Sequence, residues 1–251
     1  MSKVSLYGFN NLTKSLSFSL YRLHYVGDGI AYQDYINTTF NADKLNRLLT
    51  KICDVIGGNI LNIAKQDYQP HGASVTLMIS EEAQPSVSNL THAHSHVAHL
   101  DKSHLCIHTY PDDAPQEDIA IFRADIELST CGVISPLKVL SFVIEAFNAD
   151  VVDIDYRVRG MTRNTHGTKI FTIDHLNQLS DFLSSGIKDN FNLDEHSVKN
   201  KNIFHTRLAR KKVILDNHLF GISDSHLTKT EKNTLSKQIS HEIRQLFFHS
   251  E

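Results

Sequence analysis

Cysteine is scarce in this sequence, which has three, Cys53, Cys106 and Cys131, among 251 residues. An odd number of cysteines without a Cys-x-x-Cys pair argues against a disulfide framework and against a structural zinc site. Sparse cysteine is typical of a reducing compartment, so we expect a cytoplasmic protein.

An excess of one charge and long apolar runs are also lacking. The formal net charge is −3, too small for the whole molecule to attract nucleic acid or an anionic membrane. No apolar run reaches the roughly 20 residues that a membrane-spanning helix needs. Residues 1–7 lack the charged-then-apolar pattern of a signal peptide. We therefore expect neither a nucleic-acid partner nor a membrane partner.

Four common functional signatures are missing. The sequence contains no G-x-G-x-x-G, no phosphate-binding G-x-x-x-x-G-K, no G-x-S-x-G and no H-E-x-x-H. Dinucleotide-binding, nucleotide-triphosphate and standard hydrolase functions therefore have no support.

Strand and helix patterns alternate over the first 160 residues. Period-two alternation predicts strands over residues 15–21, 59–65, 73–80, 99–111, 119–128 and 151–158. Helical spacing predicts a helix from an N-cap at Asn41 to a stop at Gly57, and Ser135-Pro136 predicts the start of another that ends near Asn148. Because most strands follow one another directly, we expect an α+β fold, a mainly antiparallel sheet with helices on one face.

The pattern weakens after Gly160, so residues 161–251 are predicted to be an extension to a core of residues 1–160. Helical spacing predicts helices over 171–183 and 230–248. We therefore expect the extension to be largely helical.

A basic cluster lies in this extension. No interleaved aromatic residues accompany it, which favours a solvated face over a nucleic-acid patch. The cluster consists of Arg207, Arg210, Lys211 and Lys212.

Reactive side chains concentrate in the stretch from His99 to Pro111, which contains a hydroxyl, a thiol, an acid, a base and three histidines. Alternation puts Leu105 and Ile107 on one face of this strand. The opposite face carries His104, Cys106 and His108. Such a strand forms either the wall of a site or a half-buried strand with polar residues facing water.

Two further features could carry chemistry. Cys131 lies between a predicted strand and a helix start, where functional residues concentrate, and a thiol can deliver a proton near neutral pH; the alternative is a buried structural cysteine. His92, His94 and His96 would share a strand face as metal ligands do. They lie in a polar segment without a nearby carboxylate, which favours a solvated loop.

Several longer motifs stand in order along the chain. They are residues 7–16 (YGFNNLTKSL), 99–104 (HLDKSH), 107–111 (IHTYP), 122–127 (FRADIE), 129–132 (STCG), 154–160 (IDYRVRG) and 202–206 (NIFHT). Together they closely resemble the enterobacterial-type S-adenosylmethionine decarboxylase proenzymes, a pyruvoyl-dependent prokaryotic family. The resemblance runs nearly end to end, although residues 81–98 show no match.

The resemblance implies a proenzyme that cuts itself between Lys102 and Ser103 into an N-terminal beta chain and a C-terminal alpha chain. Ser103 would attack the Lys102 carbonyl and become the pyruvoyl group, which binds the substrate amine as a Schiff base. His108 matches the base in processing, and Ser74 matches a second processing residue on a weaker motif. Cys131 matches the catalytic proton donor.

The implied reaction is decarboxylation of S-adenosylmethionine to S-adenosylmethioninamine for spermidine synthesis. Decarboxylation of an amino acid needs an electron sink, which the pyruvoyl carbonyl supplies. Phe9 and Phe122 are aromatic candidates for stacking on the substrate, with core packing as the alternative.

Lys102 stands where other branches of the family often have glutamate, and the resemblance associates this branch with magnesium. Asp101, Asp125 and Glu127 are candidate ligands, with solvated acids or ion pairs as the alternative. We assign no metal ligand from the sequence.

One expectation rests on geometry alone. In an extended strand, Ser103 and His108 are about 16 Å apart at ~3.3 Å per residue, whereas a base must approach to about 3 Å of its proton. We therefore expect His108 to act on Ser103 of a partner chain across a two-fold axis. The protein would be a homo-oligomer of alpha/beta units, at least a two-fold pair, with α/β sandwich layers paired across the dimer.

Two alternatives remain open from the residues. A pyruvoyl group works on any amino acid with a free amine, so an arginine or ornithine decarboxylase on the same scaffold fits the catalytic residues equally well. The other alternative is an uncleaved, inactive homologue with a regulatory role, against which Ser103, His108 and Cys131 argue.

Overall fold

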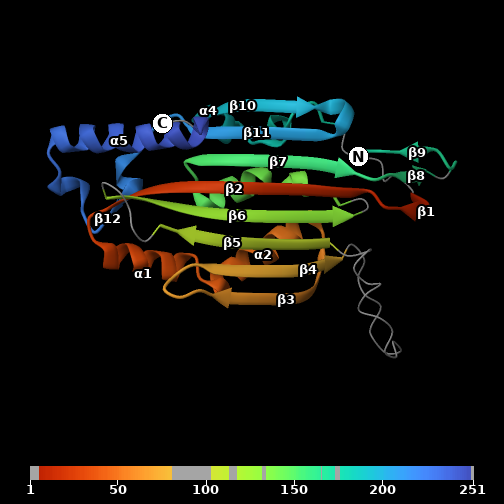
Figure 1. The fold of residues 1–251 in the computed structure, drawn as a ribbon, viewed down its shortest axis with the longest axis horizontal. Helices are drawn as coiled ribbons and strands as arrows, with labels where there is room; N and C mark the ends of the chain where they lie inside the picture. Colours follow the sequence, from red (N-terminus) through yellow and green to blue (C-terminus); the bar gives the residue numbers. More distant parts are fainter. Residues whose placement is uncertain are drawn as a thin grey trace.

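The computed structural model describes residues 6–80, 103–112, 118–131, 134–164, 166–172 and 176–249, with side chains from Asn11 onward (Figure 1). Within these ranges the chain forms two sheets, the larger one mainly antiparallel, and the helices that cover the larger sheet. No helix of the described part is long and apolar enough to cross a bilayer.

The large sheet is organised around one long central strand. This strand, β2 (Thr13–Val26), pairs antiparallel with β6 (Ile119–Cys131) on one side and with β7 (Val151–Arg159) on the other. Beyond β6 the sheet continues, in spatial order, with β5 (Ser103–Pro111), β4 (Ala73–Ser80) and β3 (Asn59–Asp67). Figure 1 shows the strands side by side.

Two further strands lie beyond β7, namely β11 (Ile203–Arg210) and then β10 (Phe191–Val198). The short β12 (Leu219–Phe220) pairs parallel with the end of β2. A separate small sheet consists of β1 (Leu6–Asn10), β8 (Thr162–Asn164) and β9 (Lys169–Ile170). The fold is therefore α+β with a mainly antiparallel sheet, as the sequence predicts.

One face of the large sheet is buried under helices. The alternating residues Leu16, Phe18 and Leu20 of β2 belong to this core. The helices that contribute to it are α1 (Gly29–Thr39), α2 (Ala42–Ile56), α3 (Leu140–Phe147) and α4 (Ser185–Asn190). The predicted caps of α2 are confirmed, because the Asn41 side chain accepts the Lys44 N–H and Gly57 ends the helix at φ 82°.

The helix predicted to begin at Ser135-Pro136 starts as a 3-10 turn. This turn, η1 (Pro136–Val139), leads into α3, which ends at Asn148 with φ 46°. The other 3-10 turns are η2 (Leu179–Phe182), η3 (Lys199–Lys201), η4 (Leu215–His218) and η5 (Asp224–His226). Ser135 makes no side-chain cap bond, so the fixed backbone of proline is the feature that starts this segment.

Helices lie on both faces of the sheet rather than on one. The long helix α5 (Lys229–Phe248) packs its buried residues, Ile239, Ile243 and Phe247, against Leu23 on the face opposite α2. Near Leu23 the residues of β2 are buried on both faces, so this end of the strand needs cover on each side. The predicted helix over 230–248 is confirmed as α5, which begins with a capping box between Thr228 and Glu231.

The residues after Gly160 are less helical than predicted. In the predicted helix over 171–183, the described residues form only the turn η2. β10 and β11 instead extend the main sheet next to β7. The alternation of Phe204, Thr206 and Leu208 on the buried face of β11 is the strand signal for this region.

A buried carboxylate joins this C-terminal part to the central strands. Asp150, which directly precedes β7, is fully buried. Its Oδ2 accepts the Leu23 N–H at 2.9 Å, and its Oδ1 accepts Arg210 Nε–H at 3.0 Å. His218 Nε2 lies 3.1 Å from the same Oδ1. One side chain thereby connects β2, β11 and η4.

The predicted basic cluster is also largely used inside the fold. Arg207 Nε–H donates to Asp153 Oδ1 at 2.6 Å, and Lys211 Nζ donates to the Asp189 carbonyl at 2.9 Å. With Arg210 bound to Asp150, three of the four cations have acceptors within the chain, but only Arg207 and Arg210 are partly buried, whereas Lys211 and Lys212 are exposed. The interpretation as a solvated face therefore holds for the two lysines and was wrong for the two arginines.

Burial alone would raise the pKa of the Asp150 carboxyl. The hydrogen bond and charge of His218, the Leu23 N–H and the charge of Arg22 outweigh burial and hold the pKa below its ordinary value of 3.8. Such a carboxyl stabilises the fold above the ordinary value, and the contribution is lost as the pH falls through the lower folded-state pKa.

We predict that Asp150→Asn lowers the free energy of unfolding near neutral pH by about 3–5 kcal/mol, because the largely buried Arg210 guanidinium loses its carboxylate partner. Urea titration measures this loss. Asp224→Asn, which removes a surface pair with Lys232, is the matched control and should cost at most about 1 kcal/mol. The difference in unfolding free energy between wild type and Asp150→Asn should become smaller as the pH falls below the ordinary carboxyl pKa of 3.8. Equal losses for the two variants would contradict the assignment.

Candidate active site

Strand β5, which carries most of the predicted reactive residues, lies between β4 and β6. Its alternation is confirmed, since Leu105 and Ile107 are fully buried whereas His104, Cys106 and His108 lie on the open face. Ser103, the first residue of the strand, is 3% exposed and continues the buried set. Ser103 and His108 therefore point to opposite faces of one strand.

At the start of β5, Ser103 meets Cys131. The backbone N–H of Cys131, the last residue of β6, donates to Ser103 Oγ at 3.1 Å. The neighbouring Thr130 hydroxyl donates to the Ile134 carbonyl at 3.3 Å and holds the chain just after the strand. The fold thus brings together two predicted site residues that are far apart in the sequence, and it orients the serine hydroxyl.

A second group forms at the other end of β5. His108 lies opposite Ser74 of β4 and opposite Asp125 of β6 in the strand registers. Tyr68 Oη lies 3.4 Å from His108 Nδ1. The registers therefore place the two predicted processing residues, His108 and Ser74, side by side.

Thr109 fixes the register at this end. Its Oγ1 accepts the Ala73 N–H at 2.8 Å and lies 3.2 Å from the Ala73 carbonyl. This buried side chain locks β4 against β5 next to Ser74 and His108. Tyr68 and Thr109 were both missed by the sequence analysis, because periodicity assigns a face to a residue but not a hydrogen-bond partner.

The two groups are separated within one chain. Five residues of extended strand place Ser103 and His108 about 16 Å apart, and the opposed faces prevent a direct approach. The structure therefore shows a serine end, with Cys131, and a histidine end, with Ser74 and Tyr68.

Phe122, a candidate for substrate stacking, has the core role instead. Its ring is 1% exposed and stacks on Phe40 with centroids 4.3 Å apart. It lies on the helix-covered face and is not available to a substrate there. The side chain of Phe9 lies outside the described residues, as do Lys102 and Asp101. His92, His94 and His96 lie outside them as well.

The magnesium candidates do not form a site in the described part of the chain. Asp125 pairs with Arg123 at 3.2 Å. Burial, followed by the charges of Asp125 and Asp155, raises the pKa of Glu127. No cluster of three or more His, Cys, Asp or Glu side chains suited to a metal occurs among the described residues. These residues therefore do not fit a magnesium centre.

Cys106 lies on the open face two residues before His108. Burial, together with the charge of Glu127, raises the pKa of its thiol. Cys106 is thus held in the protonated form near neutral pH and is not an activated nucleophile.

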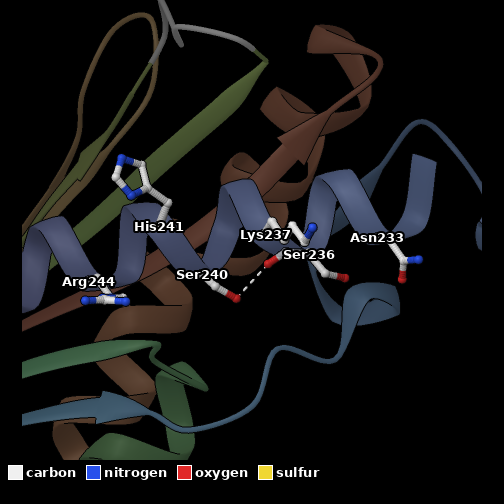
Figure 2. A pocket seen from close by; sticks show the side chains of 6 residues that line it. All are labelled: Asn233, Ser236, Lys237, Ser240, His241 and Arg244. Atoms are coloured by element: carbon white, nitrogen blue, oxygen red, sulfur yellow. Dashed lines mark hydrogen bonds between the residues drawn. The ribbon is translucent and has the colours of Figure 1, made fainter. Parts of the chain in front are cut away.

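The hollow shown in Figure 2, of about 420 Å³, lies on α5. Lys237 and Arg244 supply its charged lining, His241 adds an imidazole, and the Ser240 hydroxyl donates to the Ser236 carbonyl at 2.6 Å. All its lining residues come from α5, and none of them is a predicted site residue.

Comparison with known proteins bears on the whole chain. The family model for S-adenosylmethionine decarboxylase matches residues 24–160. The S-adenosylmethionine decarboxylase proenzyme of Pseudomonas syringae pv. syringae (strain B728a) is 44% identical over 256 residues, which cover 98% of this chain and 97% of that protein. The proenzyme of Buchnera aphidicola subsp. Acyrthosiphon pisum (strain APS) is 45% identical over 257 residues, covering 99% and 97%.

Among solved structures, the adenosylmethionine decarboxylase from Aquifex aeolicus VF5 is 16% identical and covers 70% of this chain and 100% of its own, with a TM-score of 0.36. That likeness is too low to support an argument, so the assignment rests on the sequence relatives and the family model. The chain belongs to the S-adenosylmethionine decarboxylase family.

Proposed function

We propose that this chain is a proenzyme that cuts itself between Lys102 and Ser103 and then decarboxylates S-adenosylmethionine to S-adenosylmethioninamine. Near full-length similarity to curated proenzymes supports the activity. The observation that carries the site is the bond from the Cys131 N–H to Ser103 Oγ at 3.1 Å, which joins the cleavage serine to the proton donor.

Processing begins at the serine end. Ser103 Oγ attacks the Lys102 carbonyl carbon, the amide C–N bond breaks, and the hydroxyl proton goes to the freed amine. The product is an ester. A base then removes the Ser103 α-proton, and the Cβ–Oγ bond breaks to leave a carboxylate on residue 102. Hydrolysis of the resulting dehydroalanine releases ammonia. Ser103 is suited to this role because its hydroxyl is buried and held at the first residue of β5.

Position 103 also fits the mature prosthetic group. A pyruvoyl group there supplies the carbonyl that accepts electrons during decarboxylation. Ser103 is 3% exposed, so the site excludes bulk water. The proposed proton donor, Cys131, is half-buried at the adjacent end of β6, and its backbone N–H contacts Ser103 Oγ, which supports a role beside residue 103.

The base comes from a second copy of the chain. His108 and Ser103 of one chain lie on opposite faces, about 16 Å apart along β5, so one extended chain does not complete the processing site. The open face carries the half-buried polar residues Ser74, Asp125 and His108. Because Ser103 lies on the face of β5 opposite to His108, the two-fold pairing would bring the histidine end of one chain to the start of β5 of the other, where Ser103 lies, rather than onto its open face.

The proposed chemistry has no step for magnesium, because the described carboxylates do not form a site. The three cysteines are free thiols, which supports the predicted cytoplasmic location.

The central prediction concerns Ser103. Wild-type protein should give two fragments split between residues 102 and 103, the second lacking the mass of ammonia and carrying a ketone, and should release CO2 from S-adenosylmethionine. Ser103→Ala should remain one chain without activity. Intact mass spectrometry and a decarboxylation assay on S-adenosylmethionine, arginine and ornithine measure both. Ser236→Ala on α5 is the control. An uncleaved wild type would favour the regulatory homologue, and CO2 from arginine or ornithine would favour the other substrate classes.

We predict that His108 works in trans. When differently tagged Ser103→Ala and His108→Ala chains are co-expressed, the His108→Ala chains should be cleaved, up to about half of them if chains pair at random into dimers. Each variant expressed alone should stay uncut. Mass spectrometry of the tagged chains distinguishes them. No cleavage in the mixture would show that the base acts within one chain, whereas cleavage of His108→Ala expressed alone would show that His108 is not the base.

The cut separates strands that remain paired in the sheet. β2 of the N-terminal fragment lies between β6 and β7 of the C-terminal fragment, and β4 pairs with β5 across the cut (Figure 1). We predict that the two fragments elute together from a sizing column in native buffer and separate only in denaturant. Gel analysis of the fractions measures this. Fragments that elute separately in native buffer would contradict the observed pairing.

A further inference from the structure

Tyr68 is the one hydrogen-bond partner of the His108 ring among the described residues. The phenol oxygen lies 3.4 Å from His108 Nδ1. Asp125, which faces His108 across the β5–β6 register, directs its Oδ2 to Arg123 at 3.2 Å. The other oxygen of Asp125, Oδ1, is buried without a hydrogen-bond partner and makes no bond to His108, so Tyr68 supplies the contact at Nδ1.

The fold holds Tyr68 in this place. The Tyr68 N–H donates to the Gly72 carbonyl at 2.8 Å and closes the turn between β3 and β4. Gly72 has φ 101°, and a Cβ there would lie 3.2 Å from the Thr109 carbonyl oxygen. Glycine allows this turn to approach β5 closely, so Tyr68 comes within reach of the residue next to Thr109.

The direction of this hydrogen bond decides what His108 can do. A neutral imidazole has one N–H and one lone pair. When Nδ1–H donates to the Tyr68 oxygen, Nε2 has the lone pair and can accept a proton. When the Tyr68 hydroxyl donates to Nδ1, Nε2 carries hydrogen and cannot accept one. A base that uses Nε2 therefore requires Tyr68 as the acceptor.

We infer that Tyr68 is a positioning residue that holds His108 in the tautomer with Nε2 free. The Nδ1–H bond persists when Nε2 takes the proton, because the imidazolium has both N–H groups. Tyr68 thus orients the ring before and after proton transfer without touching the reacting atoms. The inference rests on the proposed role of His108 as the processing base.

The test is Tyr68→Phe, which removes the hydroxyl and keeps the ring. Self-cleavage of freshly translated chain should slow about fivefold to tenfold, the loss expected for one hydrogen bond of ordinary strength. The ester should accumulate and be cut by hydroxylamine, whereas a folding defect would leave a hydroxylamine-resistant amide. Tyr25→Phe, a half-buried tyrosine at the far end of β2, is the matched control and should process at the normal rate.

A second measurement does not depend on processing, and its first step leaves Tyr68 unchanged. Nitrogen-15 NMR of the His108 ring in the uncleavable Ser103→Ala protein should show hydrogen on Nδ1 when the ring is neutral. Adding Tyr68→Phe should move hydrogen to Nε2 in a substantial fraction of molecules.

Hydrogen on Nε2 with Tyr68 present would overturn the inference, and so would an unchanged cleavage rate in Tyr68→Phe. If Tyr68→Phe does not fold, the tautomer in Ser103→Ala alone decides. Normal cleavage in His108→Ala would instead refute the proposed role of His108 as the base. The tautomer measurement distinguishes failure of that role from failure of the inference about Tyr68.

Discussion

The geometry of an extended strand is the constraint on which this site depends. In β5 each residue advances about 3.3 Å and each side chain points opposite to its neighbour. Ser103 and His108 therefore end up far apart and on opposed faces. Each of the two residues has its own neighbours. Cys131 lies beside the serine, and Ser74 and Tyr68 lie beside the histidine. Under the proposed mechanism, a single chain supplies two half-sites that only a second copy completes.

The register of the sheet gives each half-site its members. Thr109 pins β4 to β5 through the backbone of Ala73, and this fixes Ser74 opposite His108. A slip of one residue would turn Ser74 to the helix-covered face. The chemistry at the histidine end therefore depends on a buried threonine that takes no part in it.

Much of this arrangement follows from local patterns. Alternation along β2 and β5 predicts their faces, and Asn41 and Gly57 predict the ends of α2, because caps and strand faces depend on neighbours in sequence. The resemblance supplies Ser103, His108 and Cys131. The contact of Tyr68 with His108 joins a turn to a strand 40 residues away, which no local pattern reports. The role of Asp150 depends on Arg210 and His218, which the topology alone brings together. Phe122 has the same alternation as a pocket residue would, so only its stacking on Phe40 reveals its place in the core.

The position of β2 between β6 and β7 affects how the protein can refold before and after the cut. Before the cut, folding is a reaction of one chain with itself, and its equilibrium does not depend on concentration at that stage. After the cut, recovery from unfolding requires two polypeptides to find each other, so the same sheet becomes a second-order assembly whose yield falls with dilution. Self-cleavage is thus irreversible. The molecule gains its electrophile, and it can no longer refold as a single polypeptide.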